Sequence, residues 1–376
     1  MYDAFIAQLR EQAGTKERIA LHQPVFPGNE KQYLNDAIDS TFVSSVGPYV
    51  DKFEAAMSVV TRAPYTIATA TGTAALHVAL KTVGVGSGDL VITQPLTFVA
   101  TCNAIHYCGA EPAFVDIDPQ NLGLDPHALE RWLDEYAYID DQENCRHKAT
   151  NKKISACVPM HSFGLPAAIL RLLKVCEQWR IPLVEDAAEA LGSEFRGQAM
   201  GTFGRMGVLS FNGNKIITTG GGGMVLAQTP EDAARVKHLT TTAKRLDDFA
   251  IFHDEVGFNY RMPNINAAVG LAQLEQLNNF VARKRALAKQ YQQWLPEFGL
   301  QFVDEPADTH ANFWLITAVC QSKQQRDMLL TQTQANGIET RPAWALMHRL
   351  PMYQHCLHDG LTVATQLAER LINLPS

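Results

Sequence analysis

Residues 206–227 read MGVLSFNGNKIITTGGGGMVLA. The apolar runs 206–211 and 224–227 have the length and composition of buried strands. Between them lie Lys215 and four consecutive glycines, Gly220 to Gly223. Glycines in this position either let the backbone approach a ligand closely or form a tight turn into the second strand. The stretch therefore predicts two strands, with a lysine placed at the end of the first.

Similar apolar runs recur upstream of this stretch and alternate with helical patterns. The further candidate strands are Tyr65–Ala70, Leu90–Thr93, Pro112–Asp116, Ile154–Pro159 and Pro182–Asp186. The candidate helices between them are Thr73–Thr82, Thr97–Tyr107 and Ala167–Trp179. This alternation predicts an α/β fold with a mostly parallel sheet flanked by helices. Ligands of such sheets bind outside the carboxyl ends of the strands, where Thr71, Asp186 and Ser210 fall.

The pattern changes in the last third of the chain. Residues 264–295 predict a long helix that stops at Pro296, and residues 362–373 predict a terminal helix. The polar segment 136–153 predicts a surface excursion, and disorder of this segment stays an open alternative. We expect a large α/β domain at residues 20–262, a smaller C-terminal α+β domain at residues 263–376, and an N-terminal helical segment at residues 1–19.

Composition excludes several classes of protein. The 376 residues carry a formal net charge of −7, which argues against a nucleic-acid-binding surface. The seven cysteines are scattered without a Cys-x-x-Cys pair, which indicates reduced thiols rather than a disulfide framework. No stretch approaches the roughly 20 apolar residues of a membrane span, and the N-terminus lacks a signal-peptide core. We therefore expect a cytoplasmic protein without nucleic-acid or membrane partners.

A candidate phosphate site lies at Thr71-Gly72-Thr73, which follows a strand and opens a helix. Helix N-termini hold phosphate because their first N–H groups are free and their dipole is positive at that end. The flanking hydroxyls add donors where glycine lets the backbone come close. The alternative is an ordinary capped helix start, since threonine is a good N-cap.

Two further residues suit one cofactor. Asp186 ends an apolar strand pattern and could keep a ring nitrogen protonated, although a metal ligand or an N-cap is also common at this position. Lys215 could become a nucleophile if buried, although most lysines are solvated surface residues. A lysine for an imine, an aspartate for a pyridinium and a turn for a phosphate together indicate pyridoxal phosphate.

Other sites are disfavoured or left open. The chain has neither a G-x-G-x-x-G fingerprint nor a G-x-x-x-x-G-K-[ST] phosphate loop. His348, His355 and His358 do not share one helical face, so no metal site is predicted. His161 follows a strand and reaches either the cavity or a structural partner. Phe98 follows another strand, where an aromatic ring either stacks on a flat cofactor or joins the core.

With these residues in place, the chain resembles the DegT/DnrJ/EryC1/StrS family of sugar aminotransferases, which are fold-type I pyridoxal-phosphate enzymes. The resemblance covers nearly the whole chain. Its most specific parts are EDAAE at 185–189, SFNGNK at 210–215 and GFNYRMPN at 257–264. Within the family the chain is similar to the branch acting at C4 of UDP-4-keto-6-deoxy-N-acetylhexosamines, through STFVSSVG at 40–47, QPLTF at 94–98 and RPAW at 341–344.

The resemblance implies a role for each matching residue. Lys215 forms the imine with the cofactor and moves the proton, and Asp186 pairs with the pyridine nitrogen. Glu189 stands near the phenolic oxygen, where many members have glutamine. The other implied cofactor-binding residues are the ring contacts Phe98 and Ala188, the phosphate contacts Thr71, Gly72, Thr73 and Ser210, and Asn212, with Asn259 completing the phosphate site from the neighbouring subunit. The candidate substrate contacts are His161, Tyr260, Arg261 and His348.

Two departures from the family pattern concern Glu189 and Gly221, since relatives often have glutamate in place of this glycine. The retained Lys215 argues against dehydratase relatives, in which histidine replaces it.

The implied activity is amino transfer from L-glutamate to C4 of a UDP-ketosugar, for surface polysaccharide or nonulosonic acid synthesis. It uses pyridoxal phosphate, with pyridoxamine phosphate as intermediate, in a homodimer with shared active sites. The alternatives are a C3 ketosugar aminotransferase of the same fold, and a cofactor-binding regulator without turnover.

Overall fold

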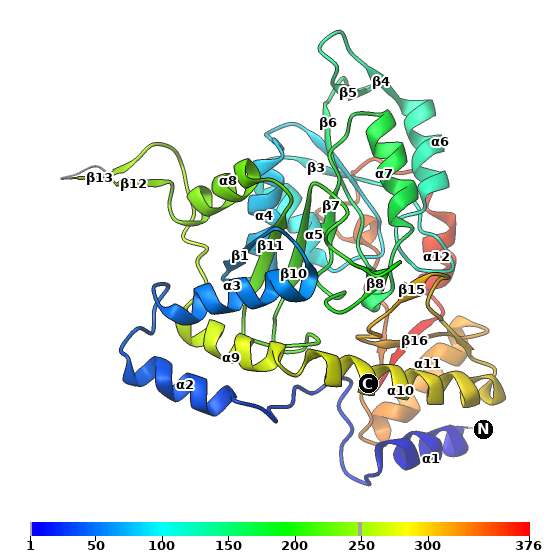
Figure 1. Cartoon of the computed structure of the whole chain (residues 1–376). Coiled ribbons are helices and arrows are strands. Elements are labelled where there is room, and N and C mark those ends of the chain that lie inside the picture. The colour runs from blue at the N-terminus through cyan, green and yellow to red at the C-terminus, as the bar shows by residue number, and fades with distance from the viewer. Residues whose placement is uncertain (1, 247–249) are drawn as a thin grey trace.

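The computed structural model describes residues 2–246 and 250–376 of the chain (Figure 1). Its centre is a sheet in which backbone bridges Cys157–Leu183 and Met160–Asp186 join a three-stranded and a four-stranded part. The combined order is β3-β2-β6-β7-β10-β11-β1. The strands are β1 (Tyr65–Thr69), β2 (Leu90–Thr93), β3 (Glu111–Phe114), β6 (Ile154–Val158), β7 (Val184–Asp186), β10 (Met206–Ser210) and β11 (Gly223–Ala227). Only β11 runs antiparallel to its neighbours in this sheet, which confirms the predicted α/β fold.

Every predicted strand of this sheet is present, with ends that differ by at most two residues. The reason is that both faces of the sheet are covered. In β10 the side chain of Val208 packs into one apolar cluster and that of Leu209 into another, and Val225 and Met224 divide in the same way in β11. Neighbouring residues of a strand point to opposite faces, so a sheet buried on both faces reads as continuous apolar runs.

Helices cover the two faces. One face is covered by α4 (Gly72–Thr82), α5 (Val99–Tyr107) and α8 (Pro230–Thr240). The other is covered by α3 (Pro48–Thr61), α6 (Pro126–Tyr136), α7 (Ile169–Gln178) and α9 (Asn264–Leu274), with α2 (Glu30–Asp39) packed on α9. Thr71 caps α4 and Thr229 caps α8, each by accepting a hydrogen bond from a first-turn N–H. The predicted helices 73–82, 97–107 and 167–179 correspond to α4, α5 and α7.

The C-terminal part of the chain forms a second, antiparallel sheet. Its strands, in spatial order, are β14 (Gln301–Phe302), β16 (Ile316–Val319), β18 (Leu371–Leu374) and β17 (Arg341–Pro342). Four helices share an apolar core with it: α1 (Tyr2–Ala13), α10 (Leu277–Trp294), α11 (Lys323–Ala335) and α12 (Thr362–Ala368). The domain division at residue 262 stays a prediction, and α9, which follows that point, packs against α2 and α3.

Two predicted helices differ from the structure. The predicted helix 264–295 is divided at Glu275–Gln276 into α9 and α10. The predicted terminal helix 362–373 is wrong beyond α12 (Thr362–Ala368), because the chain continues as β18. All four residues of β18 are buried between β16 and β17, so tertiary pairing overrides the local helical pattern.

The remaining elements are short. The polar segment 136–153 is an ordered hairpin, with Trp132 stacked on His147 at its base. A second hairpin, β12–β13, projects from the body of the molecule (Figure 1). These elements are β4 (Ala137–Ile139), β5 (Cys145–His147), β8 (Glu194–Phe195), β9 (Gln198–Ala199), β12 (Lys244–Leu246), β13 (Ile251–His253), β15 (Thr309–His310), and the 3-10 turns η1 (Ser162–Gly164), η2 (Leu295–Phe298) and η3 (Met347–Arg349). No helix within residues 2–246 and 250–376 has the length and apolarity to cross a membrane.

Candidate active site

A cavity of about 540 Å³ opens at the carboxyl edge of the main sheet. Its wall contains the segments that follow β1, β2, β7 and β10, which is where parallel sheets bind ligands. The structure brings together nine predicted cofactor-binding residues on this wall: Thr71, Gly72, Thr73, Phe98, Asp186, Ala188, Glu189, Ser210 and Asn212. Lys215 lies on the same wall, and the C-terminal sheet closes the other side with Trp314, Arg341 and Trp344.

The N-terminus of α4 meets the end of β10 at Gly72. A Cβ on Gly72 would lie 2.8 Å from the Cβ of Ser210, and a Cβ on Gly223 would lie 2.5 Å from the carbonyl oxygen of Thr71. Both distances are too short for any side chain, so glycine is required at both positions. The close approach sets the Ser210 hydroxyl beside the free first-turn N–H groups of α4, which forms a cradle for an anion.

Gly72→Ala is expected to push α4 away from Ser210 and to weaken binding of a phosphate group. Overpacking of this kind destabilises a fold by about 1–3 kcal/mol. Urea unfolding and titration with pyridoxal phosphate measure the two effects. Gly86→Ala is the matched control, because its nearest neighbour would be an ordinary contact at 3.7 Å. Equal phosphate-ligand affinity in both variants would contradict the assignment.

Asp186 lies at the end of β7 with its carboxylate buried. One oxygen accepts a hydrogen bond from the Thr101 hydroxyl at 2.7 Å, and the other accepts one from the N–H of Ala188 at 3.2 Å. Burial raises the pKa of Asp186, and these hydrogen bonds and the charge of Lys215 only partly oppose it. A cationic ring N–H bound in the cavity would supply the opposite charge that favours the ionised form. The carboxylate therefore suits a pyridinium ring.

Lys215 lies in the turn after β10, with its side chain largely buried. Its Nζ is 3.0 Å from Oε1 of Glu189 and 4.2 Å from the centroid of the Trp314 ring. The other carboxylate oxygen of Glu189 accepts a hydrogen bond from the N–H of Phe163 at 2.9 Å. Burial raises the pKa of Glu189, and the neighbouring Lys215 opposes this shift. A carboxylate that binds protons readily thus touches the amine of the candidate nucleophile.

Glu189→Gln is expected to change how stability depends on pH. A carboxyl group whose pKa is raised by folding binds its proton more tightly in the folded state, so folding stability falls as pH rises from 4.5 through the raised pKa. Because glutamine cannot ionise, the variant does not lose folding stability through this group as pH rises. The free energy of unfolding of the variant minus that of wild type should therefore increase across this window, by about 1.4 kcal/mol for each pH unit that the window spans. Urea unfolding at a series of pH values measures the difference, and a flat profile would contradict the prediction.

Aromatic side chains form the outer wall of the cavity. Phe98 is 49% exposed, and its ring centroid lies 6.4 Å from that of Trp344. Trp344 stacks on the buried Phe163 with centroids 4.7 Å apart. The predicted ring contacts Phe98 and Ala188 both border the cavity, and the sandwich they would form stays a prediction.

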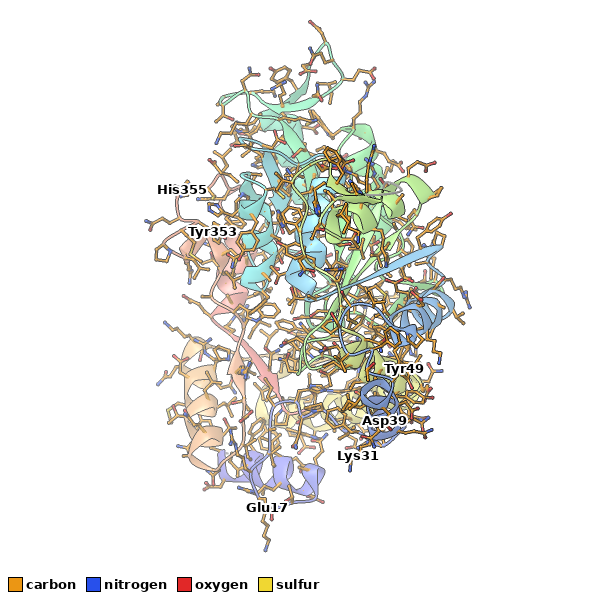
Figure 2. The ribbon with its side chains drawn as sticks, turned by 90° about the vertical axis from the view of Figure 1, so that its left-hand side faces the viewer. Glu17, Lys31, Asp39, Tyr49, Tyr353 and His355 are labelled. Atoms are coloured by element: carbon orange, nitrogen blue, oxygen red, sulfur yellow. The ribbon has the colours of Figure 1, made fainter. Side chains whose placement is uncertain are left out.

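All four candidate substrate contacts lie away from the cavity wall. His161 is fully buried: its Nε2 donates to Glu185 at 3.0 Å and its Nδ1 accepts from the N–H of Ala167 at 3.1 Å. These two hydrogen bonds agree with the alternative that His161 reaches a structural partner instead of the cavity. His348 lies beside His358, with ring centroids 5.9 Å apart. Figure 2 labels Tyr353 and His355, which follow His348 in sequence; Tyr353 is buried and its hydroxyl donates to Oδ1 of Asn103 at 2.6 Å.

The segment 259–261 contributes no side chain to the cavity of its own chain. The side chain of Arg261 bonds to that of Asn259, and the Tyr260 hydroxyl lies 3.1 Å from Nδ1 of His77. The segment nevertheless runs beside the phosphate cradle, since the N–H of Ala70 bonds to the carbonyl of Tyr260. The predicted action of Asn259 on a neighbouring subunit stays a prediction.

Sequence reasoning missed several residues of the site. Trp314 and Glu339 come from the C-terminal half of the chain, and His22 comes from its N-terminal segment. No local pattern marks them, because they reach the cavity only through the packing of the second sheet on the first. Thr101 could have been predicted from the sequence, since it lies one turn after Phe98 at the start of α5.

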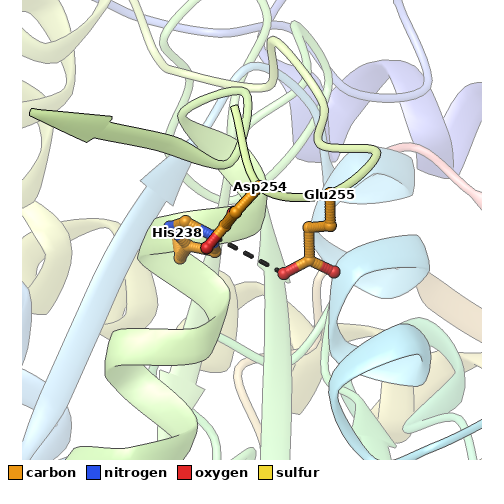
Figure 3. A group of neighbouring side chains, drawn as sticks. All are labelled: His238, Asp254 and Glu255. Atoms are coloured by element: carbon orange, nitrogen blue, oxygen red, sulfur yellow. Dashed lines mark hydrogen bonds and ion pairs between the residues drawn. The ribbon is translucent and has the colours of Figure 1, made fainter. Parts of the chain in front are cut away.

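A second group of charged side chains lies at the base of the β12–β13 hairpin (Figure 3). His238 lies 2.7 Å from Asp254 and 3.5 Å from Glu255. Arg245 pairs with Asp254 and Arg235 pairs with Glu255. Because arginines already neutralise both carboxylates, the group anchors the hairpin and is a poor metal site.

Comparisons with known proteins agree with this geometry. Residues 26–376 match the family model described as the DegT/DnrJ/EryC1/StrS aminotransferase family. The chain is 36% identical over 359 residues to a GDP-perosamine synthase of Escherichia coli O157:H7, covering 95% of this chain and 93% of that protein. It is 35% identical over 367 residues to EpsN of Bacillus subtilis, provisionally named a pyridoxal phosphate-dependent aminotransferase, covering 96% of this chain and 91% of EpsN.

A solved structure has the same fold. The aminotransferase TlmJ from Streptoalloteichus hindustanus superimposes with a TM-score of 0.85 at 27% identity. The match covers 95% of this chain and 93% of TlmJ. The two-sheet architecture therefore recurs in an aminotransferase.

Proposed function

The chain belongs to the DegT/DnrJ/EryC1/StrS aminotransferase family, and we propose that it moves the amino group of L-glutamate to C4 of a UDP-4-keto-6-deoxy-N-acetylhexosamine. It is a pyridoxal-phosphate-dependent sugar aminotransferase. The observation that supports the chemistry most directly is the presence of Lys215, Asp186 and the Gly72–Ser210 cradle on one cavity.

The cavity residues fit the cofactor. When bound, pyridoxal phosphate supplies an electron sink for negative charge on the carbon next to the transferred nitrogen. Gly72 and Ser210 would hold its phosphate at the N-terminus of α4, and Asp186 would keep its ring nitrogen protonated. Thr101 in turn fixes the Asp186 carboxylate through the 2.7 Å hydrogen bond.

Proton transfer falls to Lys215 and Glu189. In the donor half the Lys215 amine would take a proton from Cα of glutamate and then deliver it to the cofactor carbon next to the transferred nitrogen. In the acceptor half it would move a proton the opposite way, from that carbon to C4 of the sugar. Glu189, 3.0 Å from Nζ, can hold that proton in between, because burial makes its carboxylate a better base. The buried setting of both groups keeps water from exchanging with the proton.

The acceptor binds toward the C-terminal sheet. Arg341 provides a cation on the cavity wall for the diphosphate of a nucleotide sugar, and Trp344 provides a flat apolar surface for a sugar ring. The RPAW sequence at 341–344, which supports the UDP-N-acetylhexosamine branch, lies at this position.

A GDP-linked acceptor is the second candidate. It is favoured by the name of the E. coli relative, GDP-perosamine synthase, whose product is a GDP-linked sugar by that name. The two candidates share the donor half of the reaction and differ only in the nucleotide and in the group at C2.

The visible absorption spectrum of the enzyme tests both candidate acceptors. A visible band of the lysine-bound cofactor should bleach with glutamate and return with UDP-4-keto-6-deoxy-N-acetylglucosamine. If the band returned only with a GDP-linked 4-keto-6-deoxyhexose, the UDP acceptor would be rejected and the aminotransferase activity would stand. Failure to bleach with glutamate, while another amino acid bleaches the band, would reject the donor.

We also propose a homodimer in which Asn259 completes the partner's cradle. Asn259 lies outside the cavity of its own chain. The β12–β13 hairpin projects from the body of the molecule (Figure 1), and Ile251 and Phe252 of this hairpin and Val256 just after it are exposed. Exposed apolar groups on a projecting arm fit a contact with a second copy.

Mixed dimers of Lys215→Ala and Asn259→Ala chains should regain activity that neither parent shows, because one of their two sites then holds both native residues. Co-expression with two different affinity tags isolates the mixed dimer for assay. Activity of the mixed dimer no higher than that of the better parent would show that Asn259 does not act in trans.

A further inference from the structure

Trp314 contacts Lys215 from the opposite half of the chain. The Lys215 Nζ lies 4.2 Å from the centroid of the indole ring, and Trp314 is only 4% exposed. An ammonium over the face of an aromatic ring is attracted by the negative potential of that face, most strongly for tryptophan. Lys215 thus has two contacts at its amine, the Glu189 carboxylate and the indole.

The indole is held in place by four hydrogen bonds around it. Its Nε1 donates to the carbonyl of Asn214, the residue before Lys215, at 2.6 Å. The backbone N–H of Trp314 donates to Oδ1 of Asn312 at 2.8 Å, and its carbonyl accepts from the Lys284 amine at 3.0 Å and the Ser376 hydroxyl at 3.0 Å. The first bond ties the ring to the lysine's own turn and the other three fix the backbone of Trp314, so the ring cannot turn away from Lys215 without breaking the bond to Asn214.

Asn312 connects the two contacts of Lys215. Its amide nitrogen donates to the carbonyls of Glu189 at 2.8 Å and Leu191 at 2.9 Å, while its Oδ1 accepts from Trp314. Asn312 is fully buried, and a Cβ on Gly164 would lie 1.9 Å from its Oδ1. One fixed side chain thus links the backbone of Glu189 to the backbone of Trp314.

We propose that Glu189 and Trp314 form a seat for the Lys215 amine whenever that amine is not bonded to the cofactor. Trp314 is then a positioning residue of the catalytic lysine. The inference rests on the proposed function only in that Lys215 detaches and reattaches during each cycle. A lysine has a long flexible stem, so a free amine without a seat would spend much of its time away from the reacting carbon.

The seat can be tested in the cofactor-free full chain. Lys215 is acetylated with acetic anhydride, and its rate is followed by peptide mass spectrometry against the exposed Lys174. Trp314→Leu is expected to speed acetylation of Lys215 by roughly 2- to 30-fold, the range of a cation–π contact. Trp314→Phe keeps a ring face and should stay near wild type. Trp344→Leu, which removes the other cavity tryptophan, should leave the rate unchanged.

The rate of cofactor capture is a second readout, and it should change in the opposite direction to the rate of acetylation. Capture of added pyridoxal phosphate, followed by growth of the visible band, should slow in Trp314→Leu and recover in Trp314→Phe. A small reagent reaches a loose amine anywhere, whereas a cofactor fixed in the cavity needs the amine at one place. Unchanged acetylation in Trp314→Leu, an equal rise in Trp344→Leu, or equal behaviour of the Leu and Phe variants at 314 would overturn the proposal. Acetylation needs no sugar substrate, so a wrong acceptor assignment leaves this test intact.

Discussion

Lys215→Ala is expected to abolish amino transfer in both half-reactions. The residue supplies the only amine on the cavity wall within the described residues, and its Nζ lies at the Glu189 carboxylate. Loss of a positioned general base alone typically slows a reaction by about 10²- to 10⁴-fold. Loss of the covalent attachment should add to this, because alanine cannot form an imine.

Two measurements separate the parts of this prediction. The visible band of the lysine-bound cofactor should be missing in Lys215→Ala, and single-turnover mixing with glutamate should show no reaction on the wild-type timescale. Lys174→Ala, on the exposed side of α7, is the matched control and should behave as wild type. A Lys215→Ala protein with wild-type turnover would show that the cavity uses a different base.

The main sheet is predictable from the sequence for a physical reason. A sheet covered on both faces needs apolar residues at every position, so its strands stand out from the polar helix surfaces beside them. The site residues that follow those strands, such as Asp186 and Ser210, are predictable from the same rule. Lys215 stands out because it lies between a strand and a glycine run.

The rest of the site depends on long-range packing. Trp314 and Arg341 reach the cavity because the C-terminal sheet packs against the main one, and no pattern near them in sequence encodes that contact. The histidine at position 161 shows the converse, since a polar residue at a strand end can serve a buried partner such as Glu185. The local pattern predicts helix where β18 lies, because the pairing partners that make it a strand are distant in sequence.

Asp186→Asn is expected to have opposite effects on activity and on stability. Asparagine keeps the shape and one acceptor oxygen, which can serve either Thr101 or Ala188, but it carries no charge to pair with a protonated ring nitrogen. Removing such an electrostatic contact typically costs about 10²- to 10³-fold in kcat.

In the cofactor-free protein the same change should be neutral or stabilising. Burial raises the pKa of Asp186, which means that the folded state disfavours the carboxylate that asparagine replaces. Stopped-flow mixing of the loaded enzyme with glutamate measures the first effect, and urea unfolding of the cofactor-free chain near neutral pH measures the second.

The opposite signs make the assignment testable against a purely structural role. If Asp186 had only a structural role, it would act through the hydrogen bonds that it accepts from Thr101 and Ala188. Asp186→Asn would then lower stability and activity together. Thr101→Val is the matched variant, since it removes one of those bonds and leaves the charge. A Thr101→Val protein should keep most of the glutamate half-reaction, while Asp186→Asn loses it without unfolding. Such a result would identify the charge, rather than the bond network, as the part that catalysis requires.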